Sequence, residues 1–478
     1  MNYVSTRGRA PTLPFSGVLL AGLASDGGLY VPETWPQLTA NDFAALEGKS
    51  YAEVALAVMR PFVGESVSPK AFEHMVTDVY GKFGHPAVAP LRQTGPNDWL
   101  MELFHGPTLA FKDVALQLLG RLFDDVLKRE NRRITIVGAT SGDTGSAAIE
   151  GCRGRDAMDV FILYPHGRVS DVQRRQMTTV ADANVHCLAV EGTFDDCQAL
   201  VKSLFNDVEA RAKLNLSAVN SINWARVLAQ IVYYVTAAIA LGATQTKTLR
   251  GMRQRRLAFV VPTGNFGDIY AGYAAHRMGL PVEKLVIATN RNDILTRFFK
   301  GGEYRMAGVE PTISPSMDIQ ISSNFERLLF ELEERDGAVI SQFMDDLGTR
   351  KAFAVKADRL KAAKLLFGAG RADEGETLAV MRAVYAESGM QVDPHSAVGL
   401  HVARMMRRSG VLPAEVPVVT LATAHPAKFP DAVEKATGQR PALPARLADL
   451  LDRKERFTVL PNDFGAIRAH IEKHARPV

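Results

Sequence analysis

Six short runs rich in β-branched and other apolar residues recur along the chain, and they constrain its fold more than any other feature. They are Ile134–Val137, Val160–Leu163, His186–Val190, Ala258–Val261, Lys284–Ala288 and Val418–Leu421. Stretches with helical periodicity separate them. Strands that alternate with amphipathic helices form parallel sheets covered by helices on both faces, and ligands bind beyond the carboxyl ends of such strands. The loops that follow these runs are therefore where a site is expected.

The length of the chain allows more than one domain. It has 478 residues, 47% of them hydrophobic, which is enough for two or three domains. Residues 1–95 mix turn signals with short helical patterns and predict a small N-terminal domain. Residues 301–389 break the alternation with a charged, helix-rich stretch, which predicts an insertion. The remaining segments, 96–300 and 390–478, are expected to form an α/β core of two lobes.

Composition argues against several classes of protein. The longest apolar run, residues 231–243, is shorter than the ~20 residues of a membrane helix. The formal net charge is only +4 and basic residues are scattered, so no nucleic-acid partner is expected. Cys152, Cys187 and Cys197 show no paired spacing, which fits a reducing cytoplasm and argues against disulfides. No histidine pair stands at ligand spacing beside a carboxylate, so no metal site is expected.

Two of the apolar runs lead into glycine-rich turns that open helices. Ile134–Val137 precedes Gly138–Ser146, and Ala258–Val261 precedes Pro262–Gly267. Such a turn aims free backbone N–H groups at one point and makes an anion site. A helix dipole contributes about 0.3–1 kcal/mol and each hydrogen bond to a charged group about 1.5–3 kcal/mol, so several donors must converge. Neither turn has the lysine of a nucleotide P-loop, and each alone is also compatible with an ordinary strand-to-helix turn.

Hydroxyl groups and one arginine add donors near these turns. Thr140, Ser141 and Thr144 lie in the first turn. Arg226 opens a long helical pattern shortly after Ser217–Val219, which predicts a strand. An arginine there can bind a phosphate through two parallel hydrogen bonds. Taken alone, it can equally be a surface ion-pair partner.

Lys112 stands at a structural boundary. Gly106 and Pro107 punctuate the chain before it, and apolar residues recur at helical spacing from Val114 onward, which places Lys112 in the first turn of a helix. The partial positive charge of a helix N-terminus lowers the pKa of an ammonium group. A neutral lysine amine forms Schiff bases with carbonyl substrates and with pyridoxal phosphate. From this segment alone, a solvated surface lysine explains the pattern as well.

The segment from His105 to Asp113 reads His-Gly-Pro-Thr-Leu-Ala-Phe-Lys-Asp and closely resembles the cofactor-lysine segment of the threonine synthase family. Related pyridoxal-phosphate enzymes of the tryptophan-synthase β-subunit type, fold type II, carry looser versions. Ser25–Pro32, Ser314–Gln320 and Asp393–Val398 are similar to the longer threonine synthases, so the resemblance covers nearly the whole chain. It implies two α/β domains with parallel or mixed sheets and pyridoxal 5′-phosphate between them, plus the N-terminal domain and the insertion.

The resemblance also implies roles for the candidate residues. Lys112 would hold the cofactor and act as catalytic acid and base, and Thr423 would face the pyridine nitrogen. Asp143 would lie beside the 3′-oxygen of the cofactor, where its protonation state is open because a phenolate needs a shared proton. The residues that would bind the cofactor phosphate are Gly264, Asn265, Phe266 and Gly267.

The implied substrate contacts fall into two groups. The loop of Thr140 and Ser141 would bind the substrate carboxylate. The pattern Asn-Ser-x-Asn-x-x-Arg is similar to the family's binding site for the substrate's own phosphate. Its residues here are Asn220, Ser221 and Arg226, with Thr144 as a further contact.

The implied activity is the conversion of O-phospho-L-homoserine and water into L-threonine and phosphate, the last step of threonine biosynthesis. The γ-phosphate is eliminated and water adds at the β-carbon. A cytoplasmic monomer or homodimer is expected. Two alternatives remain open: a phospho-lyase that releases 2-oxobutyrate from the same substrate, and a non-catalytic metabolite-binding relative. The intact Lys112, the two glycine loops and Arg226 argue against the second alternative.

Overall fold

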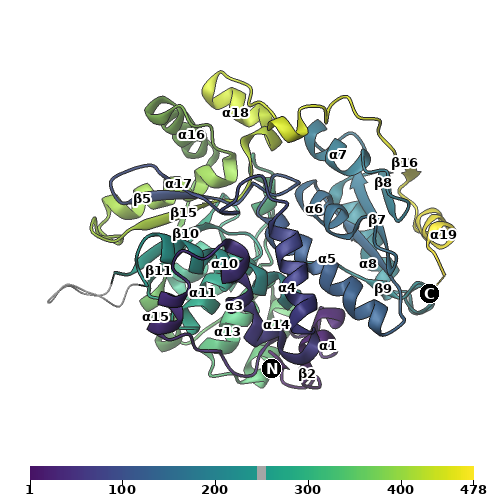
Figure 1. Ribbon diagram of the computed structural model, residues 1–478, viewed down its shortest axis with the longest axis horizontal. Helices are drawn as coiled ribbons and strands as arrows, with labels where there is room; N and C mark the ends of the chain where they lie inside the picture. The colour runs from purple at the N-terminus through teal and green to yellow at the C-terminus, as the bar shows by residue number, and fades with distance from the viewer. Residues whose placement is uncertain (245–254, 478) are drawn as a thin grey trace. The chain divides into compact units, whose positions relative to one another are not determined.

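The computed structural model describes residues 1–244 and 255–477 (Figure 1). These residues form two compact units. The first unit consists of Met1–His105 and Ser221–Pro441, and the second consists of Gly106–Asn220 and the segment from Ala442 onward. All six apolar runs are strands, which confirms the alternation predicted from the sequence. No helix in the described ranges combines the length and the apolar character that crossing a membrane requires.

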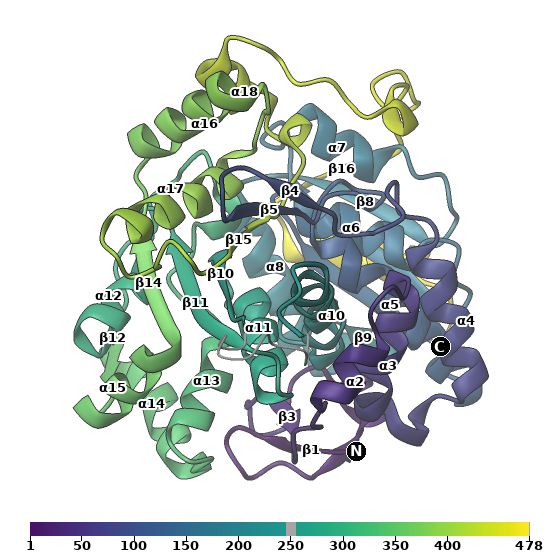
Figure 2. The same ribbon diagram turned by 60° about the vertical axis from the view of Figure 1, so that its left-hand side comes forward.

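The first unit is built around a six-stranded sheet. Its strands follow one another across the sheet in the order shown in Figure 2. They are β14 (Phe367–Arg371), β11 (Val282–Thr289), β10 (Leu257–Pro262), β15 (Val418–Ala422), β5 (Asp98–Glu102) and β4 (Leu91–Gln93). All neighbours are parallel except β4 and β5.

Helices cover both faces of this sheet. Ala258 and Val260 on β10 pack against α17 (Pro394–Arg408). Phe259, which points to the other face, has its ring 4.8 Å from that of Tyr234 on α10 (Trp224–Ala240). Because successive side chains of a strand point to opposite faces, a strand covered on both sides is apolar throughout. This explains the continuous apolar runs.

Residues 1–95 and 301–389 both lie within the first unit. In the N-terminal part, the ring of Trp224 at the start of α10 lies 5.8 Å from those of Tyr3 and Phe62. In the later part, β14 completes one edge of the main sheet. The sequence predicted an N-terminal domain, a core and an insertion. The compact units have different boundaries, because contacts between distant segments join these parts.

The first unit also contains helices and strands outside its main sheet. The N-terminal part contains β1 (Asn2–Ser5), β2 (Leu13–Pro14), α1 (Phe15–Ala21), β3 (Tyr30–Pro32), α2 (Ala40–Ala45), α3 (Tyr51–Val63) and α4 (Pro69–Tyr80). The later part contains α11 (Gly267–Arg277), α12 (Ile294–Gly301), β12 (Glu303–Arg305), α13 (Phe325–Leu332), α14 (Gly337–Arg350), β13 (Ala352–Ala354), α15 (Ala357–Leu366), α16 (Glu374–Ser388) and α18 (Pro430–Thr437). Strands β1 to β3 form a small antiparallel sheet.

The second unit holds a five-stranded parallel sheet. Its order is β16 (Thr458–Pro461), β8 (Val185–Glu191), β7 (Met158–Pro165), β6 (Ile134–Ala139) and β9 (Leu216–Ser217). Its helices are α5 (Lys112–Arg129), α6 (Asp143–Cys152), α7 (Asp171–Thr178), α8 (Phe194–Asn206), α9 (Val208–Leu214) and α19 (Phe464–His474). The strand expected at Ser217–Val219 is shorter and ends at Ser217. Apolar residues of β6, β7 and β8 pack with α8, α9 and α19 in one core.

Each sheet has one point where the order of strands reverses. In the second unit the chain runs from β6 to β7 and β8 on one side and then places β9 on the other side of β6. In the first unit it runs from β10 to β11 and β14, and later places β15 on the other side of β10. Loops at such a reversal diverge and leave a crevice outside the carboxyl ends of the strands. The candidate loops after β6, β10 and β15 all begin at these points.

Candidate active site

Lys112 is the first residue of α5 and is buried. The turn before it is held by Asp113, whose two carboxylate oxygens accept hydrogen bonds from the Thr108 hydroxyl at 2.7 Å and the Thr108 N–H at 2.8 Å. Leu109 in this turn has a φ of 63°, a left-handed conformation that costs a non-glycine residue about 1–3 kcal/mol and is concentrated at functional sites. The helix start predicted for Lys112 is confirmed, and the alternative of a solvated surface lysine is wrong.

Asp143 faces Lys112 within the second unit. Its Oδ2 lies 3.5 Å from Lys112 Nζ, and its Oδ1 accepts a hydrogen bond of 2.9 Å from Gln173 Nε2. The Ser170 hydroxyl donates to Gln173 Oε1 at 3.0 Å, which fixes the orientation of the amide. Asp143 is also the first residue of α6, where the helix dipole favours a negative charge. Gln173 carried no local sequence signal, because only the fold brings α7 to this carboxylate.

The loop after β6 is tightly folded around Thr140. The Thr140 Oγ1 accepts hydrogen bonds from the N–H groups of Gly142 at 3.0 Å and Gly145 at 2.9 Å. Gly142 has a φ of 142°, and a Cβ there would lie 2.5 Å from the Gln173 side chain, so glycine is required. Ser141 is exposed and Thr144 is half-buried at the start of α6. The structure therefore brings the three predicted hydroxyl groups into one loop, although the Thr140 oxygen shapes the loop itself.

Asn220 ends the second unit shortly after β9. It lies just beyond the carboxyl end of β9, which pairs with β6 on the side opposite β7. Its Oδ1 is buried and has no hydrogen-bond partner among the described residues. A buried amide oxygen without a donor is costly, so a bound group with a donor is expected there.

The loop after β10 presents free N–H groups. The Gly264 carbonyl accepts a hydrogen bond of 2.6 Å from the Ser322 hydroxyl, and the Asn265 carbonyl accepts bonds from Asn324 N at 3.0 Å and Asn324 Nδ2 at 2.9 Å. In a trans peptide the next N–H points opposite to the carbonyl, so these bonds aim the following N–H groups away from Ser322 and Asn324. In the described ranges, no N–H group of residues 264–267 donates a hydrogen bond.

The backbone of this loop leaves room for an anion. A Cβ at Gly264 would lie 2.8 Å from the Ser316 carbonyl oxygen, and Phe266 has a left-handed φ of 63° at the N-cap of α11. Several unbonded N–H groups at a helix N-terminus match the needs of a phosphate group. The loop therefore fits a phosphate group, which the resemblance assigns to the cofactor at Gly264 to Gly267.

Thr423 follows β15, the strand next to β10. It is buried, and its N–H donates a hydrogen bond of 3.2 Å to the Ser396 hydroxyl. Ser396 in turn donates to Asp393, the N-cap residue of α17. No hydrogen bond of the Thr423 hydroxyl is found in the part of the chain that the structure describes, so this hydroxyl is available to a ligand.

Arg226 is a buried cation in the first turn of α10. Its Nη1 is buried and has no hydrogen-bond partner among the described residues. Burial lowers the pKa of this guanidinium to about 10, so it stays charged at neutral pH. A buried charge without a partner costs several kcal/mol, on the order of 3–5 kcal/mol when a pair is broken. Arg226 therefore fits a bound anion, and the alternative of a surface ion pair is wrong.

The candidate residues divide between the two units. The second unit holds Lys112, Thr140, Ser141, Asp143, Thr144 and Asn220. The first unit holds Ser221, Arg226, Gly264, Asn265, Phe266, Gly267 and Thr423. Most of these residues follow a strand at the point where the strand order reverses, whereas Lys112 opens α5 before β6, and Ser221 and Arg226 precede β10. Sequence patterns did not indicate Gln173, Ser322 or Asn324, which hold these loops in place.

Three family models match the chain. The model described as Threonine synthase N terminus matches residues 2–80, and that described as Threonine synthase, C-terminal matches residues 396–471. The model described as Pyridoxal-phosphate dependent enzyme matches residues 86–342, more than half of the chain. These matches agree with the cofactor predicted from the Lys112 segment.

Known proteins resemble the chain over its full length. The threonine synthase of Pseudomonas aeruginosa is 54% identical and covers 99% of this chain and 98% of that protein. The crystal structure of a threonine synthase from Brucella melitensis with bound pyridoxal phosphate is 56% identical, covers 100% of both chains and has a TM-score of 0.95. The yeast threonine synthase structure is 41% identical, with a TM-score of 0.93. The predicted α/β fold and family are confirmed, and the chain belongs to the threonine synthase family of pyridoxal-phosphate-dependent enzymes.

Proposed function

We propose that this protein converts O-phospho-L-homoserine and water into L-threonine and phosphate. The observation that carries the proposal is the buried Arg226 guanidinium, whose Nη1 has no partner among the described residues. In a family that makes threonine, such a group is suited to bind the phosphate of a phosphorylated substrate. The Asn220 Nδ2 group, Ser221 and Thr144 are proposed as further contacts of the same phosphate.

Roles toward the cofactor are proposed for individual residues. Lys112 would bind its carbonyl carbon, the N–H groups of Gly264 to Gly267 its phosphate, Thr423 its pyridine nitrogen and Asp143 its 3′-oxygen. When bound, pyridoxal phosphate supplies an electron sink for negative charge at the substrate α-carbon. A neutral hydroxyl such as that of Thr423 leaves the pyridine nitrogen largely without a proton, in contrast to a carboxylate partner.

Lys112 is proposed to move protons once the substrate amine has replaced it. Its amine would take the proton from the α-carbon and serve the β-carbon in the same way. General acid–base steps of this kind contribute about 10²–10⁴-fold in rate. Asp143 Oδ2, at 3.5 Å, stabilises the ammonium form and directs the amine.

The loop after β6 and Arg226 on α10 are proposed to fix the substrate. Thr140 and Ser141 would hold its carboxylate at the N-terminus of α6, and Arg226 would hold its phosphate. Holding both ends of a short substrate keeps the breaking bonds aligned, which is how positioning lowers a barrier. We also propose that the protein acts in the cytoplasm as a monomer or homodimer, with neither a nucleic acid nor a membrane as partner.

The test is a comparison of steady-state kinetics between the wild-type enzyme, Arg226→Gln and Arg404→Gln. Arg404 pairs with Glu387 at the surface and serves as the control. Loss of charge-assisted hydrogen bonds worth about 1.5–3 kcal/mol each should raise KM for O-phospho-L-homoserine about 10- to 100-fold in Arg226→Gln alone. Phosphate and threonine should appear in equal amounts. An unchanged KM would remove Arg226 from the proposed site, and release of phosphate with 2-oxobutyrate would favour the phospho-lyase.

A further inference from the structure

One asparagine contacts two of the anion-binding loops. Asn324 Nδ2 donates a hydrogen bond of 2.9 Å to the Asn265 carbonyl and one of 3.1 Å to the Ser221 carbonyl. The Asn324 N–H adds a bond of 3.0 Å to Asn265. Asn324 is fully buried and lies in the first unit together with both loops. The cofactor-phosphate loop and the start of the substrate-phosphate segment therefore share one side-chain amide.

Arg327 fixes the orientation of this amide. Its Nη1 donates to Asn324 Oδ1, so the Nδ2 group must face the two loop carbonyls. The other guanidinium nitrogens donate to the carbonyls of Tyr30 at 3.0 Å and Ile222 at 2.6 Å. The Arg327 side chain is fully buried and stacks over the Trp224 ring at 5.7 Å. It joins β3, the segment before α10 and Asn324 in one network.

The bonds to the carbonyls set the direction of the neighbouring donors. With the Asn265 carbonyl held by Asn324, the Phe266 N–H points the opposite way. The same geometry turns the Ile222 N–H away from Asn324 when the Ser221 carbonyl is held. A change at Asn324 would therefore tilt a peptide in each loop at once.

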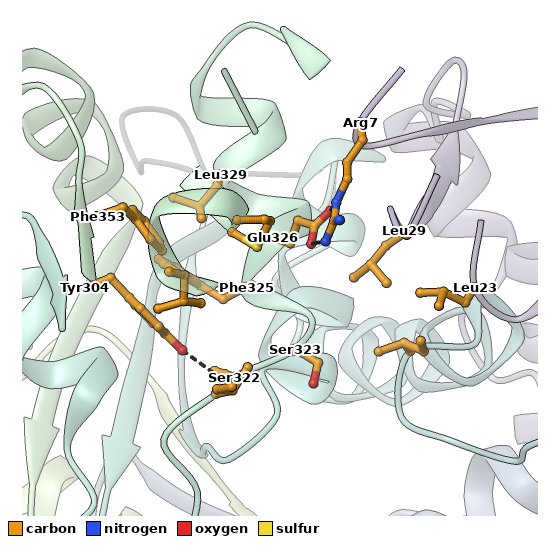
Figure 3. Close-up of a pocket in the computed structure, with 15 residues that line it drawn as sticks. Arg7, Leu23, Leu29, Tyr304, Ser322, Ser323, Phe325, Glu326, Leu329 and Phe353 are labelled. Atoms are coloured by element: carbon orange, nitrogen blue, oxygen red, sulfur yellow. Dashed lines mark hydrogen bonds and ion pairs between the residues drawn. The ribbon is translucent and has the colours of Figure 1, made fainter. Parts of the chain in front are cut away.

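Polar contacts also hold the far side of the segment that carries Asn324. Figure 3 shows Ser322, Ser323, Phe325 and Glu326 around a cavity of about 240 Å³. The Ser322 N–H donates to the Tyr304 hydroxyl at 2.8 Å, a bond drawn in Figure 3. Arg7 forms two hydrogen bonds to Glu326, of 3.2 and 3.1 Å. The Phe325 ring also stacks on that of Tyr304 at 5.5 Å, so packing, hydrogen bonds and an ion pair together hold the segment on this side.

We propose that Asn324 is a positioning residue that sets the cofactor-phosphate loop and the substrate-phosphate segment together, with Arg327 holding its amide in place. The identity of the second anion rests on the proposed function. The consequence is a coupling: one substitution at Asn324 weakens two binding sites that otherwise depend on different residues.

The experiment compares Asn324→Asp with two matched variants in the full-length protein. The dissociation constant of pyridoxal phosphate is measured on cofactor-depleted protein, and that of inorganic phosphate on cofactor-loaded protein, by calorimetry. Asn324→Asp keeps the oxygen that accepts from Arg327 but replaces the donor Nδ2 with an oxygen that faces the carbonyls of Asn265 and Ser221. It should weaken both ligands about 10-fold or more, the scale seen when groups that orient binding residues are removed. The ³¹P resonance of the bound cofactor phosphate should shift as well.

The controls separate positioning from a general loss of structure. Glu326→Gln weakens one of several contacts on the far side of the segment and leaves the Asn324 and Arg327 hydrogen bonds intact, so it should change neither constant nor the ³¹P resonance. Arg226→Gln should weaken inorganic phosphate only. If Asn324→Asp does not fold, Asn324→Ser removes the same donor without repulsion and gives the same comparison.

The outcomes are distinct. Weakening of both ligands in the Asn324 variant supports the proposal. Weakening of one ligand or of neither, while the wild-type protein binds both, overturns it. If the wild-type protein binds the cofactor but not phosphate, and Arg226→Gln makes no difference, the proposed phosphate site fails and the coupling fails with it.

Discussion

Gln173 donates a hydrogen bond of 2.9 Å to Asp143 Oδ1, and the opposite oxygen of that carboxylate faces Lys112 Nζ at 3.5 Å. Both oxygens thus face donors, and the carboxylate stands at the N-terminus of α6. Hydrogen bonds and a positive neighbour both favour the ionised form of a carboxyl group. The carboxylate of Asp143 is therefore held between Gln173 and Lys112.

Removal of the Gln173 donor should impair catalysis more than binding. Gln173→Leu keeps the size of the side chain but loses one hydrogen bond to a charged group, worth about 1.5–3 kcal/mol. We expect kcat to fall about 10- to 100-fold with a smaller change in KM, and the pH dependence of the bound cofactor's absorbance to move. Asp171→Asn, at an exposed position of the same helix, should behave as wild type. Equal kinetics for both variants would show that Asp143 needs no support from α7.

Lys112 should be required for attachment of the cofactor. Lys112→Ala is expected to lose turnover and the visible absorbance of the attached cofactor, because no other amine can take its place at the start of α5. Borohydride reduction followed by mass spectrometry should find the cofactor on the Lys112 peptide of the wild type only. Lys128→Ala, on the same helix and exposed, is the control. A variant at position 112 that kept both absorbance and turnover would contradict the assignment.

The buried Asp268 should make stability depend on pH. It follows the cofactor-phosphate loop and accepts hydrogen bonds from the hydroxyls of Tyr233 at 2.5 Å and Tyr234 at 3.0 Å. Burial raises the pKa of its carboxyl group from 3.8 to about 6. The folded state thus holds a proton that the unfolded chain has lost, and stability falls as pH rises from 3.8 to about 6.

Asp268→Asn removes this dependence. A shift of this size corresponds to about 3 kcal/mol at most. The free energy of unfolding of the variant minus that of the wild type should be larger at pH 8 than at pH 4 by up to that amount. Urea unfolding of the cofactor-depleted proteins measures this difference. The same difference between variant and wild type at both pH values would rule out this source of pH dependence.

His186 should contribute to acid lability. Its ring stacks on Phe161 at 4.4 Å, and burial lowers its pKa from 6.5 to about 4. The unfolded chain therefore binds a proton at a higher pH than the native state, and stability falls as pH drops from 6.5 toward 4. His186→Phe keeps the stacking and should reduce that loss in thermal unfolding. The exposed His74→Phe is the control, and an identical acid profile for both variants would contradict the account.

Local patterns predicted the parts of the fold that depend on neighbouring residues. The six apolar runs became strands because each is buried on both faces, and Lys112 opens a helix because the periodicity begins there. The glycine-rich turns after β6 and β10 were predicted for the same reason. Arg226 required the resemblance to a known family, because its burial depends on how α10 packs in the first unit.

Long-range contacts determine what the sequence did not predict. Strand β14 contains two glycines in five residues, which hides its β character, and only its pairing with β11 defines it. Strand β16 is largely exposed and shows no alternation, yet it pairs with β8. Gln173 and Asn324 are single polar residues whose contacts with the candidate site span 30 residues to Asp143 and 59 residues to Asn265. No local pattern encodes such a contact.

The most direct test of the proposed reaction is a product balance. The cofactor-loaded protein is incubated with O-phospho-L-homoserine, and phosphate, threonine and 2-oxobutyrate are measured in the same samples. We predict one threonine for each phosphate and no 2-oxobutyrate. Phosphate balanced by 2-oxobutyrate would contradict the addition of water at the β-carbon, and an absence of phosphate release would contradict the substrate and the role of Arg226.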